Sequence, residues 1–340
     1  MAQPQQPLLL EHVNLNVPSA EKAREFYVAL GCTVQPVTTS ARQLHLNVGA
    51  SQFHLLLHAS RVVDPPPPVP VTVAQVWPGV IEMWTTEELA ELRARMPVAE
   101  GPPAIRDDAI GCALGEVTGD ASERARGWPR APTISGGRLL CTCPWGNRYA
   151  ISPAPATFCL AAMGEHPGGV GGLVAMRRLV HPVRSPGGAA AVRGFLRSVL
   201  GFDVAPVDLD PDLRTPRCVL TFASGQALTF VETPDAPPPD ACHVDEATHG
   251  YHVAIYVGSH EAFTEAFCRA EAARALYANP RFEGGDPAFG NAMVRHVAES
   301  AGQFRVRDLA DPGDSGVLGL SLEIEVRSPR HRSCPIPAAA

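Results

Sequence analysis

The sequence predicts an α+β fold built from four modules of the order β-α-β-β-β. The first observation is Gly250–Val257, an apolar run rich in β-branched and aromatic residues that is typical of a buried strand. The second is the stretch Ser259–Tyr277 directly after it, in which Phe263, Phe267 and Ala270 recur at helical spacing. The third is that the same strand-helix unit opens three other segments of the chain. Such a repeat indicates repeated modules.

The first segment spans residues 8–57 and opens with the alternating sequence LLEHVNLNV. Alternation places His12, Asn14 and Asn16 on one face of a strand, with valine and leucine on the other face. Ser19 is suited to be the N-cap of the following helix, and Gly31 stands where a glycine ends it. Strand-like runs complete the module at residues 33–36, 43–48 and 52–58.

The other three segments repeat this order after proline-rich connectors. The second has a strand at 75–84, a helix at 86–96, a loop at 97–136 with a strand around 110–117, and strands at 138–143 and 147–152. The third has a strand at 176–183, a helix at 188–200, and strands at 202–207, 217–222 and 226–232. The fourth adds strands at 303–308 and 316–327 to the strand and helix described above.

Composition narrows the classes of function. Of the 340 residues, 45% are hydrophobic and 19% are charged, which is typical of a globular protein. The formal net charge is −7 and lysine and arginine form no cluster, so we expect neither nucleic acid nor an acidic membrane surface as partner. No apolar run reaches the roughly 20 residues of a membrane-spanning helix. The first residues carry no basic targeting flank, so we expect a cytoplasmic location.

The most specific motif is Cys143-Pro-Trp-Gly-Asn-Arg-Tyr-Ala-Ile. It resembles the D-P-x-G-N-x-x-E-L turn before the last strand of a module in the glyoxalase/bleomycin-resistance/extradiol-dioxygenase (vicinal oxygen chelate) superfamily. EHVNLNV with EKAREFYVALGC, and HVAIYV, resemble the first strand and helix of such modules. The chain departs from the motif at Cys143, where Asp is usual, and at Ala150, which replaces the carboxylate ligand.

The resemblance covers nearly the whole chain and implies that the modules pair into two domains, each with curved mixed sheets that form an open cup. We expect the N-terminal pair at 1–155, a linker at 156–171, the C-terminal pair at 172–328 and a tail at 329–340. Because four modules can complete both cups within one chain, we expect a monomer or a weak homodimer.

In this superfamily the metal ligands come from the first and last strands of the modules. In the C-terminal pair the resemblance carries these positions to His181, His252 and Glu323, with Glu325 as the alternative carboxylate. Two imidazoles and one carboxylate form the facial triad typical of non-haem iron(II), and manganese and zinc are the alternatives. His252 aligns with His12, whereas His181 falls two residues further along, level with an asparagine of the first strand.

In the N-terminal pair the candidates are His12 and His54, while the other two positions hold Gly79 and Ala150. Two ligands do not close a metal site, so we expect this cup to be a structural or binding partner.

Two further sequences imitate site motifs. The histidine-rich loop at 243–252 has no fixed ligand spacing. The turn at 286–291 is followed by a run, 292–297, that supplies no carboxylate. The strand at 316–327, which carries two glutamates, is therefore the expected last strand.

The leading hypothesis is a metal-dependent enzyme that acts on a small oxygenated molecule in the C-terminal cup. With two histidines and one glutamate as ligands, the most specific version of this hypothesis is an extradiol-dioxygenase-like ring cleavage at iron(II). One alternative is a glyoxalase-like isomerase or epimerase, which needs a base such as Glu325 beside the metal. Another is a metal-free small-molecule binding protein of the bleomycin-resistance type.

Overall fold

The computed structural model describes residues 5–57, 74–97, 131–156, 158, 166, 169, 171–210, 214–234, 236, 252–279, 292–309 and 320–336. The strand expected around 110–117, the turn at 286–291 and most of the loop at 243–252 lie outside the described residues.

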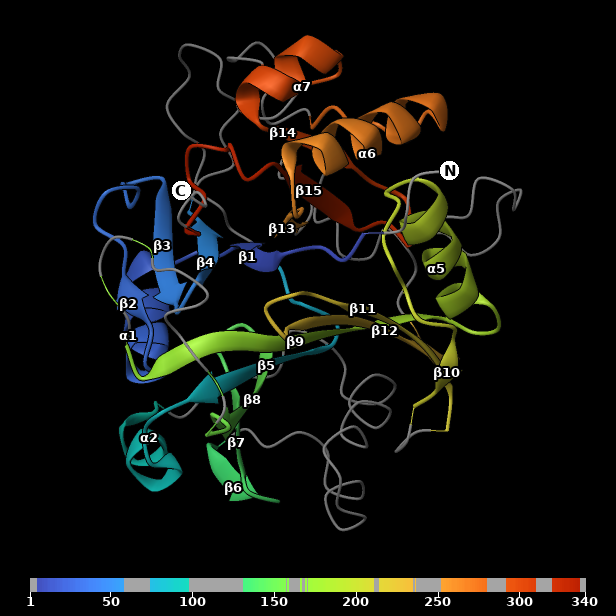
Figure 1. Cartoon of the computed structure of the whole chain (residues 1–340). Coiled ribbons are helices and arrows are strands. Elements are labelled where there is room, and N and C mark those ends of the chain that lie inside the picture. Colours follow the sequence, from blue (N-terminus) through green and yellow to red (C-terminus); the bar gives the residue numbers. More distant parts are fainter. Residues whose placement is uncertain are drawn as a thin grey trace.

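The described chain contains four β-α-β-β-β modules, which confirms the expected fold class (Figure 1). The first consists of β1 (Leu9–Asn16), α1 (Ala20–Ala29), β2 (Thr33–Val34), β3 (Gln43–Val48) and β4 (Ser51–Leu56). The second consists of β5 (Val80–Thr85), α2 (Leu89–Arg95), β6 (Thr133–Ser135), β7 (Arg138–Thr142) and β8 (Arg148–Pro153).

The last two modules follow the same order. The third consists of β9 (Leu173–Arg184), α5 (Gly188–Ser198), β10 (Asp208–Leu209), β11 (Pro216–Thr221) and β12 (Ala227–Thr233). The fourth consists of β13 (His252–Tyr256), α6 (His260–Ala272), α7 (Arg295–Ala301), β14 (Gln303–Val306) and β15 (Glu323–Arg327). In this module the single bridge between Leu276 and Val306 stands where the others have a second strand.

The modules combine into two mixed sheets. The seven-stranded sheet has the order β14-β15-β13-β1-β4-β3-β2, and the eight-stranded sheet has the order β10-β11-β12-β9-β5-β8-β7-β6. The first module therefore pairs with the fourth through β1 and β13, and the second with the third through β5 and β9. Figure 1 shows α6 and α7 over the β13–β15 half of the first sheet.

This pairing differs from the expected pairing of consecutive modules. Each module offers its first strand as an antiparallel edge, and such an edge can pair with any other first strand. Each cup consequently combines modules from both halves of the chain. That residues 1–155 and 172–328 fold as separate units stays a prediction.

Two elements also differ from expectation. The run at 292–297, taken as a possible strand, lies partly in α7, which ends at Gly302 in the left-handed conformation (φ 69°) that suits a glycine. The strand expected at 202–207 is only an isolated bridge at Phe202, followed by the short β10.

The two faces of the seven-stranded sheet have opposite character. On one face Val13, Phe53, Val253 and Ile324 belong to the hydrophobic core under the helices. The ring of Tyr27 on α1 lies 4.8 Å from that of Phe53. The alternate residues of the same strands are polar, which leaves a polar face away from the helices.

The predicted turn before β8 joins two strands of the second module. The side-chain oxygen of Asn147 accepts a hydrogen bond from Trp77 N (2.6 Å), and its Nδ2 donates to Gln75 O (3.3 Å). The thiol of Cys143 accepts from Asn147 N (3.3 Å), so the sulfur fills the acceptor role that an Asp would have. The turn therefore ties the start of β8 to the segment before β5.

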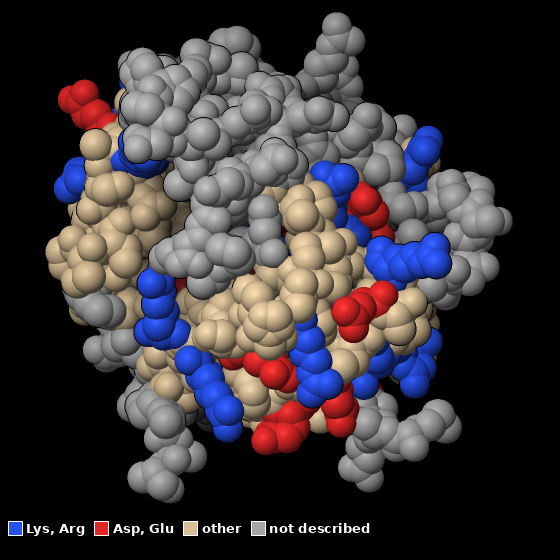
Figure 2. All heavy atoms as spheres, turned by 90° about the horizontal axis from the view of Figure 1, so that it is seen from above, with Lys and Arg blue, Asp and Glu red and all other residues tan. Residues whose placement is uncertain are grey.

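None of the helices that the structure describes is long and apolar enough to cross a membrane. Seen from above, the described surface carries basic and acidic side chains next to one another (Figure 2).

Candidate metal centre

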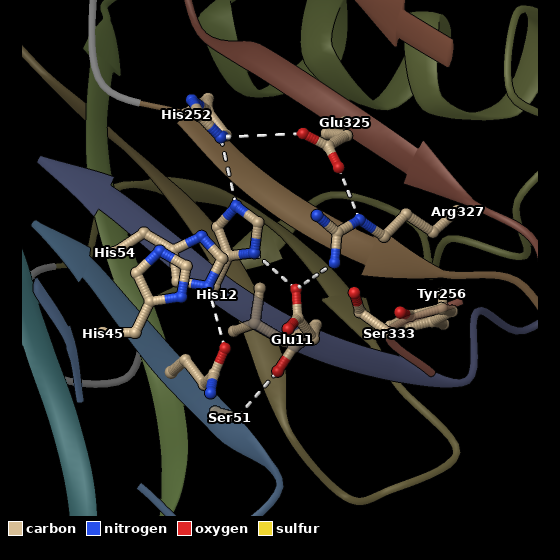
Figure 3. A network of polar contacts seen from close by, with 12 residues as sticks. Glu11, His12, His45, Ser51, His54, His252, Tyr256, Glu325, Arg327 and Ser333 are labelled. Carbon is tan, nitrogen blue, oxygen red and sulfur yellow. Dashed lines mark hydrogen bonds and ion pairs between the residues drawn. The ribbon is translucent and has the colours of Figure 1, made fainter. Parts of the chain in front are cut away.

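The candidate centre lies on the polar face of the seven-stranded sheet. Residues paired across neighbouring strands point to the same face. Register pairs Asn14 on β1 with His252 on β13 and with His54 on β4. It also pairs Ala254 on β13 with both His12 and Glu325. Side chains from four strands and both ends of the chain thus meet on one surface (Figure 3).

Three candidate ligands converge there. The Nε2 atoms of His12 and His252 lie 3.1 Å apart, and His252 Nε2 lies 3.7 Å from Glu325 Oε2. The candidate ligand atoms of these three residues all lie within 4.8 Å of one another, and all three residues are buried. Two imidazoles and one carboxylate are therefore placed within reach of one ion.

A stack of imidazole rings extends this centre along the sheet. The ring of His54 stacks on His12 at 3.7 Å between centroids and on His45 at 3.9 Å. Burial and the neighbouring His12 lower the pKa of His45 to about 4 and that of His54 well below its ordinary value. Both rings are consequently neutral near pH 7, the form in which imidazole binds metals.

Glu11 completes the site from an irregular position. The register of β1 against β13 shifts between Leu10 and His12, so the bulge at Glu11 brings its carboxylate onto the Nδ1 of His12. Burial alone would raise the pKa of Glu11, but Arg327 and His12 outweigh it and lower that pKa to about 2. A carboxylate on one imidazole nitrogen orients the other nitrogen, here toward His252.

Two arginines hold the carboxylates on β15. Arg305 donates to Glu323 and to Glu325, and Arg327 donates to Glu325 and, at 2.8 Å, to Glu11 Oε2. Burial disfavours the charged form of Glu325, but Arg305 and Arg327 prevail and hold its pKa well below the usual range. Glu325 is therefore an ionised carboxylate at neutral pH.

The charges of the described cluster do not balance. The carboxylates of Glu11, Glu323 and Glu325 face the guanidinium groups of Arg305 and Arg327. All five side chains are buried, and a buried charge without a partner is costly. One more positive charge would neutralise the cluster, from a bound cation, from a proton on an imidazole, or from a proton on Glu323, whose pKa burial raises.

Among the described residues, Asn14 carries an orphaned donor on this face. It is buried, yet its Nδ2 has no hydrogen-bond partner. Its register partners are His252 and His54. Because buried amide groups are normally satisfied, this nitrogen marks a place for an acceptor atom of a ligand.

The structure distributes the predicted site residues differently from the sequence expectation. His12, His54, His252 and Glu325 lie on one polar face, although the two pairs were assigned to separate cups. Glu323 lies on the same strand face, but its oxygens are held by Arg305 and by Asn279 (2.9 Å).

His181 is not part of this centre. It lies on β9 in the other sheet, where its ring meets Trp77 edge-on at 5.1 Å and lies 6.2 Å from Phe230. Its Nδ1 donates to Pro182 O (2.7 Å), and burial lowers its pKa to about 4. These surroundings are those of a neutral histidine in the sheet–helix core, so the trio of His181, His252 and Glu323 is not brought together.

The sequence reasoning missed Glu11, His45, Arg305 and Arg327. Strand alternation could have found three of them, since they are polar residues two positions apart from other polar residues on β3, β14 and β15. Alternation could not have found Glu11. In a regular strand its side chain would point to the opposite face from His12, and only the bulge brings it to the same face.

The described residues of the eight-stranded sheet form no equivalent centre. Matching the registers of the two sheets places Arg178 level with His12, Thr229 with His54, Val80 with His252 and Ala150 with Glu325. Ala150 is the replacement expected from the motif. The resemblance assigns Gly79 to the position equivalent to His252, but register places its neighbour Val80 there. Imidazole is absent from all four positions, so the two cups differ in chemistry.

No protein-family model and no curated protein matches the sequence. The fold is similar to glyoxalase I from Zea mays (TM-score 0.47, 10% identity, 94% of this chain and 92% of that chain). Parts of it are similar to a mutant of the fosfomycin resistance protein FosX from Listeria monocytogenes with Mn(II) (TM-score 0.26, 9% identity, 45% and 91%). Similar too is a lactoylglutathione lyase from Agrobacterium tumefaciens (TM-score 0.24, 15% identity, 43% and 92%).

These TM-scores lie below 0.5 and the identities are low, so no activity is transferred from these proteins. The four β-α-β-β-β modules and the two mixed sheets are nevertheless the fold class expected from the sequence, although the modules pair differently. The fold class that the resemblance implied is thus confirmed by the structure itself.

Proposed function

We propose that the chain is a metal-dependent enzyme that acts on a small oxygenated molecule in the cup of the seven-stranded sheet. The observation that carries the proposal is the convergence of His12, His252 and Glu325 within 4.8 Å on a buried face. Two nitrogen ligands and one oxygen ligand suit iron(II), manganese(II) or zinc(II). When bound, such an ion would act as a Lewis acid on neighbouring oxygens of the substrate.

The residues around this trio suit a substrate with oxygen atoms. The unpaired Nδ2 of Asn14 can donate to a substrate oxygen, and the neutral ring of His54 can accept or donate a proton there. The Glu11 carboxylate orients His12, and the nearby arginines keep Glu11 and Glu325 ionised. These roles require no movement of the strands.

The pKa values of Glu11 and Glu325 argue against these two carboxylates as the base of the isomerase form. A glyoxalase-like isomerase needs a base whose pKa lies near the working pH. Against the effect of burial, Arg305 and Arg327 hold the pKa of Glu325 far below that range, and Arg327 and His12 hold that of Glu11 there. Both carboxylates are therefore weak bases.

One observation favours metal-free binding as a second candidate. Both oxygens of Glu325 already accept hydrogen bonds from guanidinium groups, from Arg305 on one and Arg327 on the other. In a metal-free protein the same face would bind an oxygenated ligand through its imidazoles and Asn14.

Metal uptake separates the two candidates. Protein stripped of metal would be titrated with Co(II), whose visible spectrum reports nitrogen and oxygen ligation, and the bound metal counted. We expect saturable uptake, lost in Glu325→Gln and retained in the matched variant Glu323→Gln, whose carboxylate lies outside the trio. Oxygen consumption with a catechol on the iron(II)-loaded protein would then test the dioxygenase form. Binding of no metal by the wild-type chain would leave only the metal-free candidate.

We also propose that the chain is a monomer or a weak homodimer, because four modules complete both sheets within one chain.

A further inference from the structure

The polar face of the eight-stranded sheet carries an excess of positive charge. The buried carboxylate of Glu82 on β5 accepts a hydrogen bond from Arg178 on β9. Its Oε2 lies 3.3 Å from Arg177 Nη1, and its Oε1 lies 3.9 Å from Arg138 Nη1. Three guanidinium groups therefore surround one carboxylate, and two of their positive charges have no counterion among the described residues of this cluster.

A bulge creates this arrangement. Register pairs Arg178 with Glu82 and Met176 with Met83, so Arg177 has no partner on β5. Arg177 and Arg178 can therefore both reach Glu82, although they are consecutive in the sequence.

Several polar atoms on this face lack a hydrogen-bond partner among the described residues. They include Arg138 Nη1, Arg178 Nε and the hydroxyl of Thr229. Thr229 is only 1% exposed and is paired with Val180, which lies two residues beyond Arg178 and therefore on the same face. Buried donors are normally satisfied, so these atoms indicate that an acceptor belongs here.

The arginines are nevertheless open to small molecules. The side chains of Arg138, Arg177 and Arg178 are 25%, 36% and 19% exposed, while Glu82 is 2% exposed. The carboxylate thus holds the guanidinium groups from beneath, and their outer edges remain accessible. Trp84 lies beside them, with the guanidinium carbon of Arg177 6.0 Å from its ring.

We propose that this face is a second, metal-free site that binds the oxyanion group of a small molecule, either a carboxylate or a phosphate. Guanidinium groups match the geometry and charge of both oxyanions. Glu82 keeps the arginines in place, the hydroxyl of Thr229 supplies a neutral donor, and the ring of Trp84 offers an apolar surface to the rest of the ligand. The two cups then bind different chemistry: a metal ion in one and an anion in the other.

The test is a titration of the full chain with benzoate, acetate and inorganic phosphate, followed by calorimetry and by tryptophan fluorescence. We expect saturable binding of at least one probe and a fluorescence change that Trp84→Phe removes. Tighter binding of benzoate than of acetate identifies a carboxylate ligand with an apolar part, whereas binding of phosphate alone identifies a phosphate ligand.

Arg177→Ala is the most informative variant. Glu82 keeps Arg178 and Arg138 as partners in it, so we expect the protein to fold normally. We expect about tenfold weaker binding from the loss of one charge-assisted contact. The matched control is Arg217→Ala on β11 of the same sheet, where Arg217 pairs with Asp208 instead. Absence of saturable binding at millimolar concentrations, or equal affinity in wild type and Arg177→Ala, would overturn the proposal. Cobalt uptake in the other cup is measured in parallel and is expected to be unchanged, so the two sites are judged separately.

Discussion

At the scale of single residues, alternate residues of a strand point to opposite faces of the sheet, and this decides which histidines can bind the same ion. Register places Val180, and not His181, at the position equivalent to Asn14. A match that is wrong by one residue turns a side chain to the opposite face of its sheet. The structure brings the predicted residues His12 and His252 to one face. His181 lies in the core, which the sequence did not show because the connection from β9 to α5 could not be aligned to a single residue.

Acid titration tests the placement of His181. Burial lowers its pKa from 6.5 to about 4, with the Pro182 carbonyl opposing. Between these values the unfolded chain binds a proton that the folded chain does not, so stability falls as the pH falls from 6.5 to 4. The expected contribution is about 3 kcal/mol. Chemical denaturation across this range should show a smaller decline for His181→Gln than for the wild type, and an identical decline would contradict the buried position.

Asn147 offers a second test at this scale. Its buried side chain bonds the backbone at Trp77 and Gln75, and these groups have no water to replace it. We expect Asn147→Ala to lower the free energy of unfolding by about 2–3 kcal/mol. Thr133→Ala, at an exposed position, serves as the control in the same urea titration. A change below that of the control would show that the turn does not hold the strands.

At the scale of elements, the local sequence predicted which strands and helices exist better than it predicted the residues at which they begin and end. Helix α1 begins after Ser19, whose hydroxyl accepts from Lys22 N (3.3 Å), as its sequence indicated. Short strands and the α7 segment were less predictable, since a few residues at an irregular edge carry no clear period.

The serine caps of helices α1 and α6 should contribute to stability. Ser259 accepts a hydrogen bond from Ala262 N (3.1 Å) at the start of α6. We expect Ser259→Ala to cost about 1 kcal/mol, and Ser259→Asp to cost less, because an aspartate can also cap a helix. Thermal unfolding followed by circular dichroism would measure both, and equal losses in the two variants would argue against capping.

At the scale of the whole molecule, the pairing of modules is the feature that sequence reasoning could not supply. His12 and His252 are 240 residues apart, and no local pattern states which first strands pair. The number and order of the modules followed from periodicity, but the cups depend on long-range strand pairing. Consequently His12, His54, His252 and Glu325 were named from the sequence but assigned to two separate sites.

Gln226 is a residue through which the two sheets are joined. Its Nε2 lies 3.1 Å from Leu10 O, 2.9 Å from Ser51 Oγ and 2.9 Å from Met176 O, and it is fully buried. Gln226→Ala would leave these groups unsatisfied between the sheets, so we expect a loss of about 3 kcal/mol in unfolding free energy. Equilibrium denaturation would measure it. Ser224→Ala, which removes only the contact of Ser224 with Gln226, should cost much less.

The central claim is that the two ends of the chain build one metal site. The most direct measurement is the amount of metal bound per chain after reconstitution, in wild type, His12→Ala and His181→Ala, with circular dichroism confirming that each variant is folded. We predict one ion per chain in the wild type and in His181→Ala, and none in His12→Ala. Loss of metal in His181→Ala with full retention in His12→Ala would contradict the claim.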